Sequence, residues 1–145
     1  MATSRCTDWH TYDWVNVRRP DGRVERVYLS HLYMCVYSRD NGDLDVRIEQ
    51  IGMIGVRLDW EMKAWRFNPL APGAYHGFWK LGGTRTGYVS ADSMSTRIFT
   101  NCKPGWWVVT VKYADRYTDL HPGFQSIIIP HGNVTDPKPS SRPVW

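Results

Sequence analysis

The stretch KPGWWVVTVKY, residues 103–113, decides the fold class. Bulky and β-branched side chains alternate between two faces after the proline and glycine, which is the period of a β-strand. One face would carry Trp107, Val109, Val111 and Tyr113. The other face would carry Trp106, Val108, Thr110 and Lys112. The pattern predicts a strand whose first face packs into a core.

A proline-glycine turn followed by a strand with an aromatic residue near its start resembles the penultimate strand of immunoglobulin-like sandwiches. The resemblance extends to residues 124–129, which would form a last strand ended by Pro130. It carries no specific motif, so it implies an architecture and no activity. That architecture is an antiparallel Greek-key sandwich.

Alternation is equally clear in two earlier segments. In residues 54–63 the apolar positions alternate with mostly charged ones, and residues 44–49 follow the same pattern. Each segment is therefore predicted to be a strand with one wet face. Gly52 and Gly55 supply a flexible break between them, so we expect the two strands to be antiparallel neighbours.

Turn-forming residues mark several hairpins. The triplet PDG at residues 20–22 is expected to join residues 14–17 to residues 24–28, and DNGD at residues 40–43 to join residues 33–37 to the strand at Leu44. The run GGTR at residues 82–85 is expected to separate strands at residues 78–81 and 87–89. A short strand at residues 96–100 follows.

Length and composition agree with one folded domain. The chain has 145 residues, a net charge of +4 and 14% aromatic residues, which excludes a disordered chain. It lacks an apolar run that would span a membrane or serve as an export signal, so a soluble protein is expected. We predict an all-β fold, a single antiparallel β-sandwich or small barrel, with an N-terminal arm at residues 1–12, a sandwich at residues 13–130 and an extended tail at residues 131–145.

No catalytic, cofactor or metal signature is present in the sequence. The five histidines are scattered, and the segment DWHTYD at residues 8–13 is better explained as polar chain packing on the core than as an acid–base or metal site. Three cysteines make a disulfide framework unlikely. Cys35 is expected to be a small buried hydrophobe, and a bridge from Cys6 to Cys102 is left open.

The C-terminal tail carries the leading hypothesis about function. Its composition indicates an extended segment with polyproline character. We expect it to dock on a neighbouring surface, another copy or a different protein, through Pro137, Pro139, Pro143, Val144 and Trp145. Packing along its own domain is the alternative. Under the docking hypothesis, deleting residues 134–145 leaves the melting temperature nearly unchanged.

The sequence therefore predicts a non-enzymatic structural or interaction protein that is a subunit of a larger assembly. A virion component, such as a capsid-decoration or tail accessory protein, fits its size and terminal arms. The first alternative is a carbohydrate-binding module that stacks sugars on Trp65, Tyr75, Trp79 and Tyr88. The second is a single-strand nucleic-acid binder with phosphate contacts from Arg18, Arg19, Arg23 and Arg26. For that arginine cluster we favour a solvated hairpin surface.

Overall fold

The structure is a computed structural model that describes residues 2–7, 10–52, 57–69, 78–115 and 123–143. The described residues form β-strands joined by turns and loops. The strands are β1 (Thr3–Cys6), β2 (His10–Arg18), β3 (Val24–Ser38), β4 (Leu44–Gly52), β5 (Arg57–Asn68), β6 (Phe78–Ser90), β7 (Ser93–Phe99), β8 (Gly105–Asp115) and β9 (Gly123–His131).

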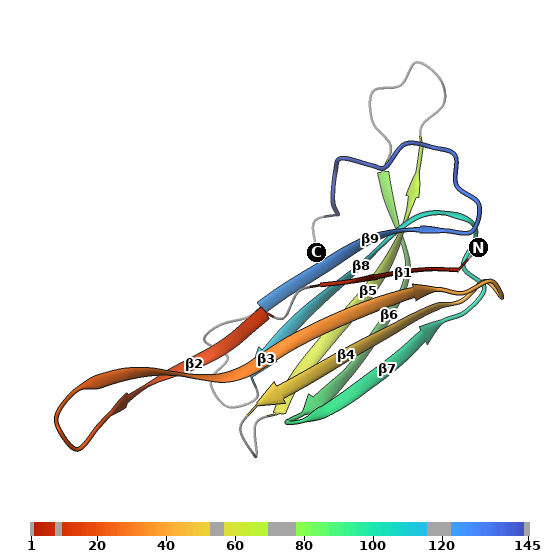
Figure 1. The fold of residues 1–145 in the computed structure, drawn as a ribbon. Coiled ribbons are helices and arrows are strands. Elements are labelled where there is room, and N and C mark those ends of the chain that lie inside the picture. Colours follow the sequence, from red (N-terminus) through yellow and green to blue (C-terminus); the bar gives the residue numbers. More distant parts are fainter. Residues whose placement is uncertain (1, 8–9, 53–56, 70–77, 116–122, 144–145) are drawn as a thin grey trace.

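These strands form two antiparallel sheets packed face to face (Figure 1). Sheet A has the order β1-β3-β4-β7, and β2 also pairs with β3. Sheet B has the order β6-β5-β8-β9. The expected all-β antiparallel sandwich is confirmed. Its Greek-key connectivity and its terminal arms stay predictions.

The core lies between the sheets and follows the alternation of the strands. In β8, the face predicted to be apolar is the one that belongs to the core cluster, and Tyr113 on this face is completely inaccessible to solvent. In β5 the buried positions are Leu58, Trp60, Met62 and Ala64. The burial of apolar side chains on the facing surfaces of both sheets is the main force holding the two layers together.

Two predicted hairpins are confirmed, and both depend on a glycine. The β2–β3 turn places Gly22 at φ +86°, and the β3–β4 turn places Gly42 at φ +95°. Both values lie in the left-handed region, which glycine enters without steric cost. Backbone hydrogen bonds from Gly22 to Arg19 and from Gly42 to Arg39 close the two turns.

The predicted pairing of the strands at residues 44–49 and 54–63 is wrong. β4 pairs with β3 and β7 in sheet A, whereas β5 pairs with β6 and β8 in sheet B. The chain crosses between the layers after β4. Alternation gives each strand an apolar face, and it does not tell which sheet that face belongs to.

The predicted turn at residues 82–85 is also wrong, because β6 runs unbroken through it. Gly82 and Gly83 lie opposite a register shift between Ala64 and Trp65. A Cβ atom on Gly82 would lie 2.7 Å from Cζ3 of Trp107. These glycines therefore allow close packing inside a strand instead of ending it.

The N-terminal residues contribute to sheet A. Residues 3–6 of the predicted arm form β1, in which Cys6 lies directly opposite Cys35 of β3. These two cysteines form a disulfide, so Cys35 is not a free hydrophobe and Cys6 is not bridged to Cys102. Cys102 is free and buried, and burial is the main reason that its pKa is raised.

Candidate functional site

The most prominent feature outside the sandwich is a two-stranded ribbon. The pairing of β2 with β3 continues as far as Arg18 opposite Val24, whereas β3 pairs with β4 only from Ser30 onward. Among the described residues, β2 pairs only with β3, and residues 24–29 of β3 pair only with β2. Figure 1 shows this ribbon, residues 14–29, projecting beyond both sheets.

The ribbon tip carries the arginines that were candidates for phosphate contacts. Arg19 Nε lies 2.6 Å from Glu25 Oε2, and Arg23 Nε lies 2.6 Å from Asp21 Oδ2. Arg18 is exposed, and the side chain of Arg26 lies outside the described residues. Two of the four candidate cations thus already have carboxylate partners within the tip, which lowers the net positive charge offered to a polyanion.

The outer face of sheet B, which points away from the core, forms a second candidate surface. Val108 and Ile128 lie opposite each other in register, and their sequence neighbours Trp107, Val109, Ile127 and Ile129 all belong to the core cluster. Successive side chains of a strand point to opposite faces, so Val108 and Ile128 face outward. Both are nevertheless buried, with 0% and 6% of their surface exposed. Something must cover them.

The segment that crosses this face is the C-terminal tail, residues 132–143. The indole N–H of Trp106 donates to the carbonyl of Asp136 at 2.8 Å, and the indole N–H of Trp79 donates to the carbonyl of Ser141 at 3.1 Å. Between these two contacts lies Pro139, which is buried. The tail therefore packs as a third layer against one end of the outer face of sheet B. Figure 1 shows it passing the upper ends of β5 and β6.

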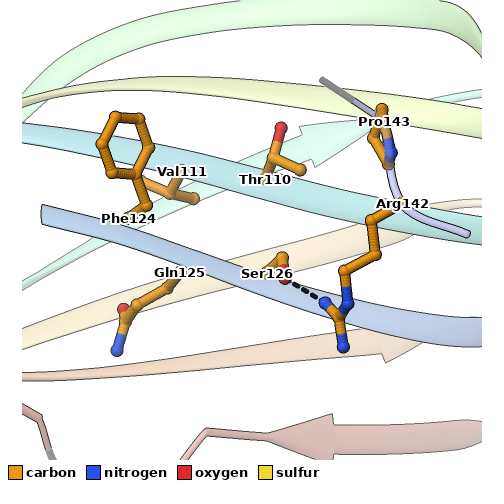
Figure 2. Close-up of a pocket in the computed structure, with 7 residues that line it drawn as sticks. All are labelled: Thr110, Val111, Phe124, Gln125, Ser126, Arg142 and Pro143. Atoms are coloured by element: carbon orange, nitrogen blue, oxygen red, sulfur yellow. Dashed lines mark hydrogen bonds between the residues drawn. The ribbon is translucent and has the colours of Figure 1, made fainter. Parts of the chain in front are cut away.

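The end of the described tail lines a small pocket on the same face (Figure 2). Arg142 reaches across to donate a hydrogen bond to the hydroxyl of Ser126 on β9. Pro143 lies over β8 near Thr110, and Phe124 lines the far side. The pocket has a volume of about 170 Å³. Its wall is thus formed partly by the tail itself.

The three described residues of the predicted aromatic platform lie at two ends of sheet B. Trp79 packs edge-on against Phe67, with ring centroids 5.0 Å apart, and Trp65 donates to the hydroxyl of Thr110 at 3.1 Å. Tyr88 lies at the other end of β6, where the guanidinium of Arg57 covers its ring at 3.8 Å. Tyr75 lies outside the described residues. Trp65 and Trp79 share one end of sheet B, and that end carries the tail.

The predicted docking residues of the tail have different surroundings. Pro137 is exposed, Pro139 is buried and Pro143 is half-buried, while Val144 and Trp145 lie outside the described residues. The described part of the tail packs along its own domain, which was the alternative to docking on a partner. The sequence had no signal for this contact, because the tryptophans and the tail carbonyls are separated by 30 and 62 positions.

One buried polar pair was not predicted from the sequence. The hydroxyl of Ser38 donates to Nδ1 of His131 at 2.7 Å, and Nε2 of His131 contacts the carbonyls of Gly42 and Cys102 at 3.1 and 3.0 Å. These partners assign the proton to Nε2. Both side chains are sealed from solvent, at 1% and 2% exposure, so the pair joins β3 to β9 and its serine is not accessible to a substrate.

Within the described residues, no group of three or more histidine, cysteine or acidic side chains is arranged to hold a metal ion. Nor does that part of the chain contain a helix long and apolar enough to cross a membrane. Comparisons of the chain with protein-family models, with curated proteins and with solved structures found no match.

Proposed function

We propose that the protein is a non-enzymatic subunit of a homomeric assembly, and that the β2–β3 ribbon joins one copy to the next. The observation that carries this proposal is the length of the ribbon beyond the sheets. Its pairing runs to Arg18 and Val24 without support from any other described strand. A role in assembly explains why the chain extends a strand pair into solvent.

A two-stranded ribbon gains little from its own contacts. An isolated hairpin is at best marginally stable in water, because each strand has only one paired edge and no packed face. Residues 18–25 at the tip are all exposed, and Val24 keeps 62% of its surface. Covering this tip on a partner would stabilise the ribbon and bury its apolar surface.

A second copy of the chain is the partner that the ribbon suits best. Within the described residues, the outer edges of its strands pair with no further strand, and two identical edges can pair antiparallel about a twofold axis. The tip carries Arg18, Arg19 and Arg23 against Asp21 and Glu25, so like charges do not dominate it. Such a tip does not strongly repel a copy of itself, and it offers little net charge to nucleic acid.

Sedimentation velocity of the purified chain, from about 1 to about 300 µM, tests the proposal. We expect the average molecular mass of the sedimenting species to rise with protein concentration. Val24→Asp should shift this rise to at least tenfold higher concentration. Ile98→Asp is the matched control, because Ile98 on β7 is also an exposed apolar residue, at 47%, but lies away from the ribbon. A chain that stays monomeric at every concentration would contradict the proposal. So would an equal loss of self-association in both variants.

The kind of assembly is a finer question. A virion component remains our proposal for it, supported by the size of the chain and the projecting ribbon. The glycan-binding and nucleic-acid-binding hypotheses receive less support. Trp65 and Trp79 already have partners in the chain, and so do Arg19 and Arg23.

A further inference from the structure

The tail contacts sheet B in the way that a separate proline-rich peptide contacts an aromatic groove. Such grooves present tryptophan side chains to an extended segment and recognise its carbonyls with indole N–H groups. Here Trp106 and Trp79 donate to carbonyls five residues apart, those of Asp136 and Ser141. Pro137 and Pro139 lie between them. Proline residues favour the extended conformation in advance, so less entropy is lost on docking.

The dimensions of this contact agree with an extended segment that crosses the strands. Trp106 lies on β8 and Trp79 on β6, and β5 separates these strands in sheet B. Two strand spacings amount to about 10 Å, and five residues of polyproline helix span about 15 Å. The segment can therefore reach both tryptophans. It then bends, so that Arg142 contacts Ser126 on β9 and Pro143 lies over β8 (Figure 1).

The seat beneath the segment is apolar. Val108 and Ile128 point outward on this face and are buried, and Pro139 of the tail is buried as well. Arg142 adds a polar contact to Ser126 at the end of the segment. Apolar burial supplies the affinity, and the two indole N–H groups with Arg142 fix the position of the segment.

None of these contacts depends on the bond that connects the tail to β9. The connection consists of residues 132–135, of which Gly132, Asn133 and Thr135 are exposed. Gly132 adopts φ +72°, where the chain leaves the strand. If the connection takes another path, the same segment can reach the same face of a neighbouring molecule with every contact kept.

We propose that the outer face of sheet B is a binding site for an extended proline-rich segment, and that residues 136–143 of a second copy occupy it when two copies exchange tails. This inference rests on the tail and sheet B alone and is independent of the ribbon. A short connection gives the chain's own tail an effective concentration in the millimolar range. Exchange is therefore expected only where copies are crowded or where the internal contact is lost.

Binding of a labelled peptide of residues 134–145 to a chain that ends at residue 133 tests the site. We expect saturable binding by fluorescence anisotropy, and at least tenfold weaker binding to the intact chain, whose own tail competes. Trp79→Phe and Trp106→Phe in the shortened chain each remove one donor and should weaken binding about 3- to 10-fold. Tyr88→Phe is the control, because Tyr88 lies at the other end of β6, away from the tail, so the affinity of this variant should stay unchanged. A folded shortened chain that ignores the peptide, or equal effects of all three variants, would overturn the proposal.

The shortened chain can lose stability when sheet B is uncovered, so a second format is needed. An intact chain with a protease site at residues 133–135 folds with its tail in place and is then cleaved. We expect the cleaved tail to exchange with labelled peptide, and excess peptide to raise the melting temperature of the cleaved protein. Failure of the peptide to bind or to stabilise the cleaved protein would count against the site.

Exchange between copies is tested by mixing two defective chains. One carries Trp79→Phe and Trp106→Phe with an intact tail, and the other ends at residue 133 with an intact face. Both chains also carry Val24→Asp, which removes the ribbon contact and separates the two proposals. Light scattering after size exclusion should then show a 1:1 complex that neither chain forms alone. Only monomers at about 100 µM would exclude tail exchange.

Discussion

At the scale of single residues, glycines of β6 make room for tryptophan rings from β5 and β8. A Cβ atom on Gly87 would lie 2.6 Å from Cζ2 of Trp60, closer than carbon atoms approach without contact strain. The guanidinium of Arg97 lies 5.0 Å from the centre of the Trp60 ring, so the ring cannot easily shift away. The glycine at this position is therefore required by packing.

Gly87→Ala should destabilise the fold by about 1–3 kcal/mol, because the added methyl group forces a large ring out of place. Thermal unfolding monitored by circular dichroism measures the effect. Thr86→Ala, at the exposed neighbouring position, is the control and should change little. A Gly87→Ala protein with an unchanged melting temperature would show that Trp60 is not held where we describe it.

Tyr113 links stability to alkaline pH. Burial raises the pKa of its phenol above the ordinary value of 10.0, and its hydroxyl donates to Oε1 of Gln125 at 2.7 Å. The folded state thus keeps a proton that the unfolded state releases. This stabilisation is complete below about pH 10 and is lost as the pH rises further, by about 1.4 kcal/mol per pH unit.

Tyr113→Phe should remove that alkaline slope and cost about 1 kcal/mol at neutral pH for the lost hydrogen bond. Urea unfolding at several pH values from neutral to about pH 11 measures both effects. Cys102, whose pKa is also raised, is present in both proteins, so the difference isolates Tyr113. Tyr88→Phe, which changes a half-exposed ring, is the control and should keep the alkaline slope of stability. If Tyr113→Phe also kept this slope, the result would be evidence against a buried phenol at Tyr113.

At the scale of elements, β1 is held to sheet A by a covalent bond as well as by pairing. The disulfide joins positions 29 residues apart. Arg5 donates to the carbonyl of Ile128 at 3.2 Å, so β1 also spans the gap to β9 of sheet B. The short strand thus closes one side of the sandwich.

Replacing both Cys6 and Cys35 by alanine should lower the free energy of unfolding by about 3–4 kcal/mol, the loop-closure value for a loop of this length. Equilibrium urea unfolding of the oxidised and the substituted proteins gives the difference. Adding a reductant to the oxidised protein should reproduce the loss. Equal unfolding midpoints in all three samples would mean that the bridge does not form.

The elements differ in how well the sequence predicted them. β8 and β5 were predictable because each places one apolar face on a core, and the turns at Gly22 and Gly42 because their φ values require glycine. The sequence predicted a turn at Gly82, within what is one strand, β6. The reason for this glycine is its contact with the ring of Trp107, which is remote in sequence. The Cys6–Cys35 bridge depends on the register between β1 and β3, which no local pattern contains.

At the scale of the whole molecule, the tail is part of the fold. The sequence suggested that removing residues 134–145 leaves the melting temperature nearly unchanged. The structure gives a different expectation, because the tail packs on the outer face of sheet B, where Val108 and Ile128 are buried. The tail was predicted to be an extended segment. Its position on sheet B was not predicted, because the sequence shows only that aromatic residues such as Trp79 and Trp106 are numerous.

Deletion of residues 134–145 should therefore lower the free energy of unfolding by about 2–4 kcal/mol, the cost of exposing two aliphatic side chains. Denaturant unfolding of the shortened and intact chains measures it. Pro137→Ala is the control, because Pro137 is exposed and should contribute little. An unfolding free energy that is the same with and without the tail would argue that the third layer is only loosely attached.

The proposed function of the protein depends on the joining of copies through the ribbon. Hydrogen exchange of the backbone amides of residues 16–19 and 21–25, measured in dilute and in concentrated solution, tests this claim directly. We predict rapid exchange in dilute protein and clear protection of these amides at high concentration, while exchange in β5 and β8 stays the same. Ribbon amides that exchange equally fast at both concentrations would contradict the claim.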